Sequence, residues 1–172
     1  MKKHKYIVNK NKCKNPNAVK FIRYIQIASI IVVLLVLLYT ALMSLITHVD
    51  FATIISENAS ITCGFILAMQ AIVTFYVAKN MRKEVSDLEN FETNRFRLLM
   101  IAISSFATVN YIIGILSVIA LVKFYKWKGS FSLSDMFTEI KKESHLNDSI
   151  LLFIVYLLLC TLQWIIGSMV IR

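Results

Sequence analysis

The chain has 172 residues, of which 58% are hydrophobic and only 17% are charged, and its 19 Lys and Arg residues outnumber its 10 Asp and Glu residues. This composition is too apolar for a water-soluble domain of that length. It excludes a soluble globular protein and indicates an integral membrane protein.

The apolar residues are gathered in four blocks that contain no Asp, Glu, Lys, Arg or His. These blocks are residues 25–47, 61–78, 98–122 and 150–171. About 20 residues at a rise of 1.5 Å cross a hydrocarbon core of about 30 Å, so each block is a candidate membrane span. The sequence therefore predicts an all-α integral membrane protein, a four-transmembrane-helix bundle over residues 25–171, preceded by a basic cytoplasmic tail over residues 1–24. Pro16 is the only proline, so we expect straight, unbroken helices.

The orientation of the bundle follows from its basic residues, because cytoplasmic loops carry an excess of Lys and Arg. Eight of these residues lie in the tail, none in the first connection, five in the second and five in the third, and Arg172 ends the chain. With both termini in the cytoplasm, 14 basic residues lie inside and 5 outside. We therefore predict a multi-pass protein of the cell membrane with its N-terminus and C-terminus cytoplasmic.

The third connection departs from this bias, because it is basic yet lies on the predicted outer side. Lys123 follows the third span directly, and Tyr125 and Trp127 suit anchors in the membrane interface. Apolar residues at helical spacing, Phe137 among them, predict a short amphipathic helix over about 133–144 on the outer leaflet. These four residues form a candidate outer interfacial contact, although an ordinary aromatic belt explains them without any ligand.

The N-terminal tail is basic and has no acidic residue. Such a segment next to a membrane is attracted to anionic lipid. Alternatively, its charges serve only to orient the first helix. We expect no nucleic-acid partner, because the tail has no recognition motif.

Two amides lie near the centres of predicted spans, Gln70 in the second and Asn110 in the third. Buried amides usually form hydrogen bonds with a neighbouring helix, so we expect these two to pair, with Gln163 a less favoured partner. Small or polar residues on one side of the third helix would allow close packing there. The candidate intramembrane packing or polar site is therefore Gln70, Asn110, Ser104, Gly114 and Ser117. The alternative is that Gln70 and Asn110 line a small transport site.

The sequence offers little for catalysis. His48 and Cys63 form a nominal nucleophile and base pair near the outer surface, but no third group orients them. No hydrolase, metal-ligand or phosphate-binding motif is present. The spans also lack the ionisable groups that proton-coupled carriers need. We expect no enzyme activity, no metal and no cofactor.

These patterns lead to two hypotheses about function. The first is a non-enzymatic polytopic protein of a bacterial cytoplasmic membrane that acts through protein or lipid contacts, as an accessory subunit or an immunity-type protein. The second is a transport or pore component that works as an oligomer. A bacterial source of low GC content is inferred from the excess of Lys over Arg, 14 to 5.

Overall fold

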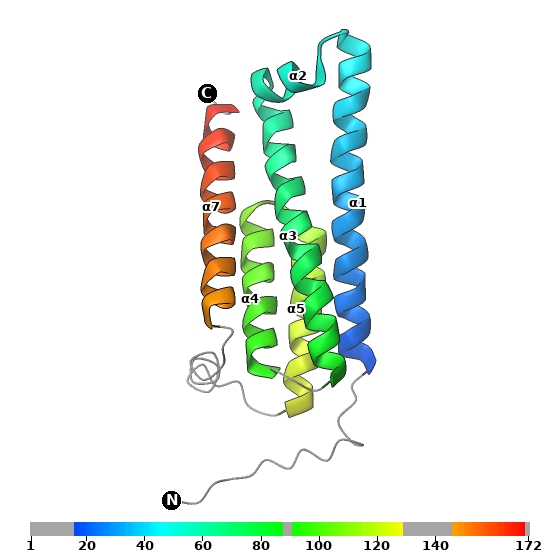
Figure 1. Cartoon of the computed structure of the whole chain (residues 1–172), viewed down its shortest axis with the longest axis vertical. Helices are drawn as coiled ribbons and strands as arrows, with labels where there is room; N and C mark the ends of the chain where they lie inside the picture. Colours follow the sequence, from blue (N-terminus) through cyan, green and yellow to red (C-terminus); the bar gives the residue numbers. More distant parts are fainter. Residues whose placement is uncertain (1–15, 88–90, 129–145, 171–172) are drawn as a thin grey trace, which may run out of the picture.

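The computed structural model describes residues 16–87, 91–128 and 146–170, with side chains described over 19–85, 93–123 and 149–168. The described residues form helices and no strands. The helices are α1 (Pro16–Thr47), α2 (Phe51–Glu57), α3 (Ala59–Asp87), α4 (Phe91–Ala107), α5 (Tyr111–Lys128) and α7 (Leu146–Val170) (Figure 1). The predicted amphipathic helix over 133–144 and most of the basic tail lie outside the described residues.

Among the described residues, three helices are long and apolar enough to cross a membrane. Their apolar segments are Val19–Thr47 in α1, Ala59–Val85 in α3 and Ser149–Ser168 in α7. The three segments correspond to the first, second and fourth predicted spans. Helix α1 begins at Pro16, so the first helix extends into the predicted tail, and Ile22 is fully buried in the core.

A capped turn joins α1 to α3 at the upper end of the bundle in Figure 1. The Asp50 carboxylate accepts a hydrogen bond from the backbone N–H of Ala52 at 3.1 Å, which caps the N-terminus of the short helix α2. The Asn58 side chain does the same for α3, accepting from the N–H groups of Ser60 and Ile61 at 3.1 and 3.2 Å. Each cap satisfies N–H groups that the first helical turn leaves unpaired.

The predicted third span, residues 98–122, is not one helix. Helix α4 ends at Ala107 and α5 begins at Tyr111, and the two form a hairpin whose tip stops well short of the upper end of the bundle (Figure 1). The prediction of unbroken helices, which relied on the absence of proline, is wrong here. The described part of the chain therefore has three long apolar helices and a hairpin between the second and third of them.

The helix break at the hairpin tip is a Schellman motif without glycine. Asn110 donates its backbone N–H to the Ser105 carbonyl at 2.7 Å, and Val109 donates to the Phe106 carbonyl at 3.3 Å. Val109 adopts φ 61°, the left-handed conformation that this motif requires and that glycine usually provides. The Asn110 carbonyl then accepts the first hydrogen bond of α5, from Gly114 at 3.0 Å. The short turn between Ala107 and Tyr111 thus reverses the direction of the chain.

The buried core lies in the lower part of the bundle, where the hairpin fills the space beside the long helices. There α1 packs on α3 and α5, α3 packs on α7, and α4 packs on α5 and α7, which closes a ring of five helices. The fully buried residues of this core include Ile25, Met81, Leu98 and Ile113. Above the tip, the apolar side chains of α1 and α7 are largely exposed.

The two ends of the helical chain lie at opposite ends of the bundle. Helix α1 begins at the lower end in Figure 1, whereas α7 ends at the upper end. This differs from the predicted arrangement, in which both termini lie on one side. The difference follows directly from the hairpin, because α4 and α5 together return the chain to the end from which α4 started.

The left-handed residue at the tip gives a test of this geometry. Valine is strained at positive φ and glycine is not, and 61% of the Val109 side chain is exposed, so little packing is lost on its removal. We expect Val109→Gly to raise the free energy of unfolding by about 1 kcal/mol. Thermal or denaturant unfolding of the purified protein in detergent measures this change.

The matched control is Val118→Gly, at an exposed position within α5. There glycine should lower the free energy of unfolding by about 1 kcal/mol, because it weakens a helix interior. A similar loss of stability in both variants would contradict the left-handed turn.

Candidate functional site

The hairpin tip is held by amide side chains from two neighbouring helices. The Thr108 hydroxyl donates to Gln70 Oε1 of α3 at 2.6 Å. From α7, Gln163 Nε2 donates to the Thr108 backbone carbonyl at 3.1 Å. That carbonyl is at the C-terminal end of α4, where a helix leaves carbonyl groups without partners. Thr108 therefore joins α3, α4 and α7 at one point.

Further polar contacts join the same helices just below this point. The Thr74 and Tyr156 hydroxyls lie 2.9 Å apart between α3 and α7, and both residues are 1% exposed. The Cys160 thiol lies 3.9 Å from the Ser104 carbonyl, as a weak donor between α7 and α4. These polar contacts add to the packing of α7 on α3 and α4.

Two amide atoms at the tip have no hydrogen-bond partner among the described residues. They are Gln70 Nε2 and Gln163 Oε1, one donor and one acceptor, and both atoms are buried. Each belongs to an amide whose other atom contacts Thr108. A donor and an acceptor that both lie next to Thr108 can be satisfied by a single small polar molecule such as water.

The predicted pair of amides is close but not joined as expected. Gln70 is 1% exposed and Asn110 is 7% exposed, so both are buried, but the Gln70 side chain bonds to Thr108. Asn110 acts through its backbone, ending α4 and starting α5. Gln163, the less favoured partner, does contact the tip.

The small residues of the predicted site allow the two arms of the hairpin to approach each other. A Cβ atom at Gly114 would lie 3.2 Å from the Phe106 ring across the hairpin. Ser104 on α4 and Ser117 on α5 are buried, and each hydroxyl donates to a carbonyl of its own helix. They lie on two helices, rather than on one face of a single helix as predicted.

The other predicted residues are only partly described. Lys123 is half-buried near the C-terminal end of α5, at the same end of the bundle as the start of α1 (Figure 1). The side chains of Tyr125 and Trp127, and all of Phe137, lie outside the described residues. No hydrogen bond joins His48 to Cys63, which is a free thiol in α3.

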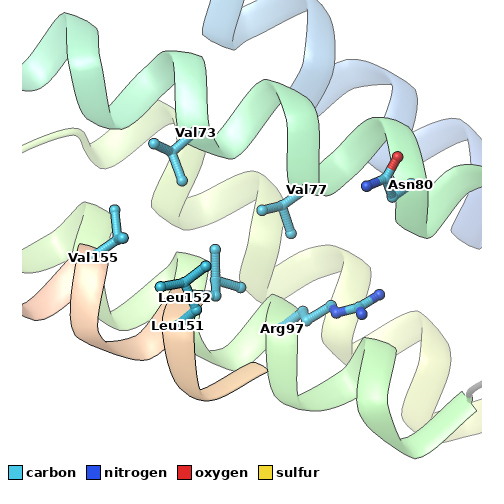
Figure 2. A pocket seen from close by; sticks show the side chains of 7 residues that line it. All are labelled: Val73, Val77, Asn80, Arg97, Leu151, Leu152 and Val155. Carbon is cyan, nitrogen blue, oxygen red and sulfur yellow. The ribbon is translucent and has the colours of Figure 1, made fainter. Parts of the chain in front are cut away.

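A second polar cluster lies at the lower end of the bundle. Arg97 Nη1 donates to both carboxylate oxygens of Glu84 at 3.0 Å and to Asn94 Oδ1 at 3.3 Å. The Arg97 side chain is 9% exposed. A pocket of about 330 Å³ opens beside it between α3, α4 and α7. Figure 2 shows Arg97 and Asn80 at one end of this pocket and valine and leucine side chains along the rest.

Sequence reasoning missed the residues that hold both clusters together. Thr108, Tyr156 and Arg97 were not singled out. Four polar residues within positions 104–110 were the available signal for the helix break, because Ser, Thr and Asn compete for backbone hydrogen bonds. Arg97 and Glu84 face each other across a short connection, and no periodic pattern marks such a pair.

No family model matches the chain, and no curated protein or solved structure matches it.

A double-mutant cycle tests the contact between α3 and the tip. We expect Gln70→Leu and Thr108→Val to couple by about 0.6–2 kcal/mol, because each removes the same interhelical hydrogen bond. Unfolding free energies of the wild-type protein, the two single variants and the double variant, measured in detergent, give the coupling.

The control cycle combines Gln70→Leu with Ser117→Ala. The Ser117 hydroxyl bonds only within α5, so these two effects should add within about 0.5 kcal/mol. Equal coupling in both cycles would show that the Gln70 to Thr108 contact has no specific energetic role.

Proposed function

We propose that the chain crosses the cytoplasmic membrane of a bacterium three times, with α4 and α5 forming a re-entrant hairpin from the cytoplasmic side. The length of α4 and the position of Gln70 support this arrangement. From Leu98 to Thr108, α4 rises about 15 Å, half of an apolar core of about 30 Å. Gln70, which bonds to the tip, is likewise near the middle of the apolar block 61–78.

The distribution of charge also supports this topology. Residues 1–24, 79–97 and 123–149, the segments outside the apolar blocks, then lie on one side. They carry eight, five and five of the 19 Lys and Arg residues, and only Arg172 lies on the other side. The basic third connection, an exception in a four-span bundle, then obeys the positive-inside rule.

Within the membrane, we propose a non-enzymatic role through protein or lipid contacts, as in an accessory subunit or an immunity-type protein. The observation that carries this proposal is that the buried polar groups form hydrogen bonds between helices. Gln70, Thr108, Gln163 and Tyr156 contact one another's helices, while α1 and α7 keep broad apolar faces exposed. Such faces suit lipid or the helices of a partner.

The second candidate, a transport or pore component that works as an oligomer, is favoured by one observation. Re-entrant chain is tolerated at membrane depth where it is buried in protein or lines a polar cavity. The unpaired atoms Gln70 Nε2 and Gln163 Oε1 are the groups that could contact a solute at the tip.

Cysteine labelling distinguishes the three-span from the four-span topology. In a variant with Cys13, Cys63 and Cys160 replaced by Ala, Lys128→Cys should resist an impermeant maleimide in intact cells, and Ser168→Cys should react. The reason is that the hairpin returns α5 to the cytoplasmic side and leaves α7 to end outside.

Two exposed positions, one at each end of the bundle, calibrate the labelling experiment. Glu57→Cys on α2 should react in intact cells, and Arg82→Cys on α3 should react only after permeabilisation. Reaction at Lys128→Cys combined with protection at Ser168→Cys would overturn the three-span topology.

Flux through proteoliposomes distinguishes the two candidate roles. If the protein acts by contact, vesicles containing it should release potassium ions and small neutral solutes no faster than empty vesicles. Flux above that of empty vesicles that falls in Gln70→Met, a variant of similar shape without the amide, would instead establish the transport role. Circular dichroism of each variant shows whether it is folded.

A further inference from the structure

We propose that the pocket between α3, α4 and α7 binds one anionic phospholipid of the inner leaflet, with its phosphate at Arg97 and an acyl chain along the valine and leucine side chains. This inference rests on the proposed topology, which sets the depth of the pocket in the membrane. It deepens the proposed contact function by naming the chemical class of one partner.

The apolar part of the pocket has the direction and lining that an acyl chain needs. It is formed by Val73 and Val77 on α3 and by Leu151, Leu152 and Val155 on α7. From Asn80 to Val73 the pocket follows α3 for about 10 Å toward the middle of the apolar block. Figure 2 shows these side chains converging from two helices on one space.

The polar end of the pocket lies at the level of lipid headgroups. Arg97 immediately precedes the apolar block 98–122, and Asn80 lies two residues beyond the block 61–78. Both residues therefore lie where hydrocarbon gives way to the interface. A molecule that fills the pocket must be apolar toward the membrane centre and polar at this end, and a phospholipid has that distribution.

The Arg97 guanidinium has donors to spare for a phosphate. All its hydrogen bonds to Glu84 and Asn94 use Nη1, so Nε and Nη2 have no partner within the described residues. The Glu84 ion pair holds the guanidinium in place without using these donors. Arginine binds phosphate through two parallel N–H groups, and the Asn80 amide lines the same end of the pocket.

The guanidinium charge of Arg97 selects an anionic headgroup. Lys79, Arg82 and Lys83 lie on the same turns of α3 as Asn80 but are exposed to solvent, so they contribute little to the choice, and Glu84 is already paired with Arg97. A zwitterionic headgroup would bring its own cation next to this guanidinium. An anionic headgroup, such as that of phosphatidylglycerol, brings only the negative charge of its phosphate, and the site lacks such a charge.

Native mass spectrometry of the full-length protein in detergent tests the proposal. Phosphatidylglycerol and phosphatidylcholine with identical acyl chains serve as probes. We expect one phosphatidylglycerol to bind at least about tenfold more tightly than phosphatidylcholine, because the choline cation is repelled by Arg97 and competes with it for the phosphate, and weakening a charged hydrogen bond is worth a factor of that order. Arg97→Gln should abolish the preference, and Arg97→Lys should retain part of it.

The matched control for charge is Arg82→Gln, an exposed arginine at the same end of α3 that does not line the pocket. It should leave the preference within about twofold of the wild type, since an exposed charge contributes little. An equal loss in Arg97→Gln and Arg82→Gln would mean general attraction to a basic surface and would overturn the proposal.

Variants that fill the apolar part keep the test valid if Arg97→Gln does not fold. Val155→Phe should remove binding of both lipids, whereas Leu157→Phe, at an exposed position that does not line the pocket, should not. Equal binding by these two variants would overturn the proposal.

If cysteine labelling supports three spans but no lipid preference is found, only the lipid site fails. If labelling supports four spans, the proposed topology fails, and with it the depth on which the lipid site rests.

Discussion

A chain that reverses direction leaves the backbone groups of two helix ends without helical partners, and in the proposed topology there is no water in the hydrocarbon core to pair with them. At the hairpin tip these groups are paired internally. Asn110 and Val109 donate to carbonyls near the end of α4, and the Thr108 carbonyl accepts from Gln163. The last of these bonds needs α7 beside α4, so the break in the third apolar segment and the position of α7 depend on each other.

The same constraint explains why the bundle is packed so unevenly. Below the tip, the hairpin supplies two extra helices, and the core closes around residues such as Met81 and Leu98. Above it, α1 and α7 expose apolar side chains such as Leu38 and Trp164. In water such faces would drive aggregation. In a membrane they meet lipid or another protein, which agrees with the proposed role through contacts.

The buried polar side chains of the bundle form two groups, one at the hairpin tip and one at the lower end. Those at the tip join helices and leave one donor and one acceptor unpaired. Those at the basic end hold Arg97 at the edge of a largely apolar pocket. Sequence position alone suggested the importance of Gln70, since an amide in an apolar block needs a partner. It did not identify Thr108, because a threonine in a helix can satisfy its hydroxyl on its own backbone.

The sequence by itself determined that the chain is helical and rich in long apolar segments, since both follow from composition and block length, and it predicted four such segments as membrane spans. It did not determine that residues 98–122 turn back at Val109. That region has enough apolar residues for a full span, and the turn is held by contacts of Thr108, next to Val109, with neighbouring helices. Those contacts come from Gln70 and Gln163, 93 positions apart in the chain. Only the tertiary structure therefore decided how many of the described helices are long and apolar enough to span a membrane, and with it the side of the membrane on which each basic segment is proposed to lie.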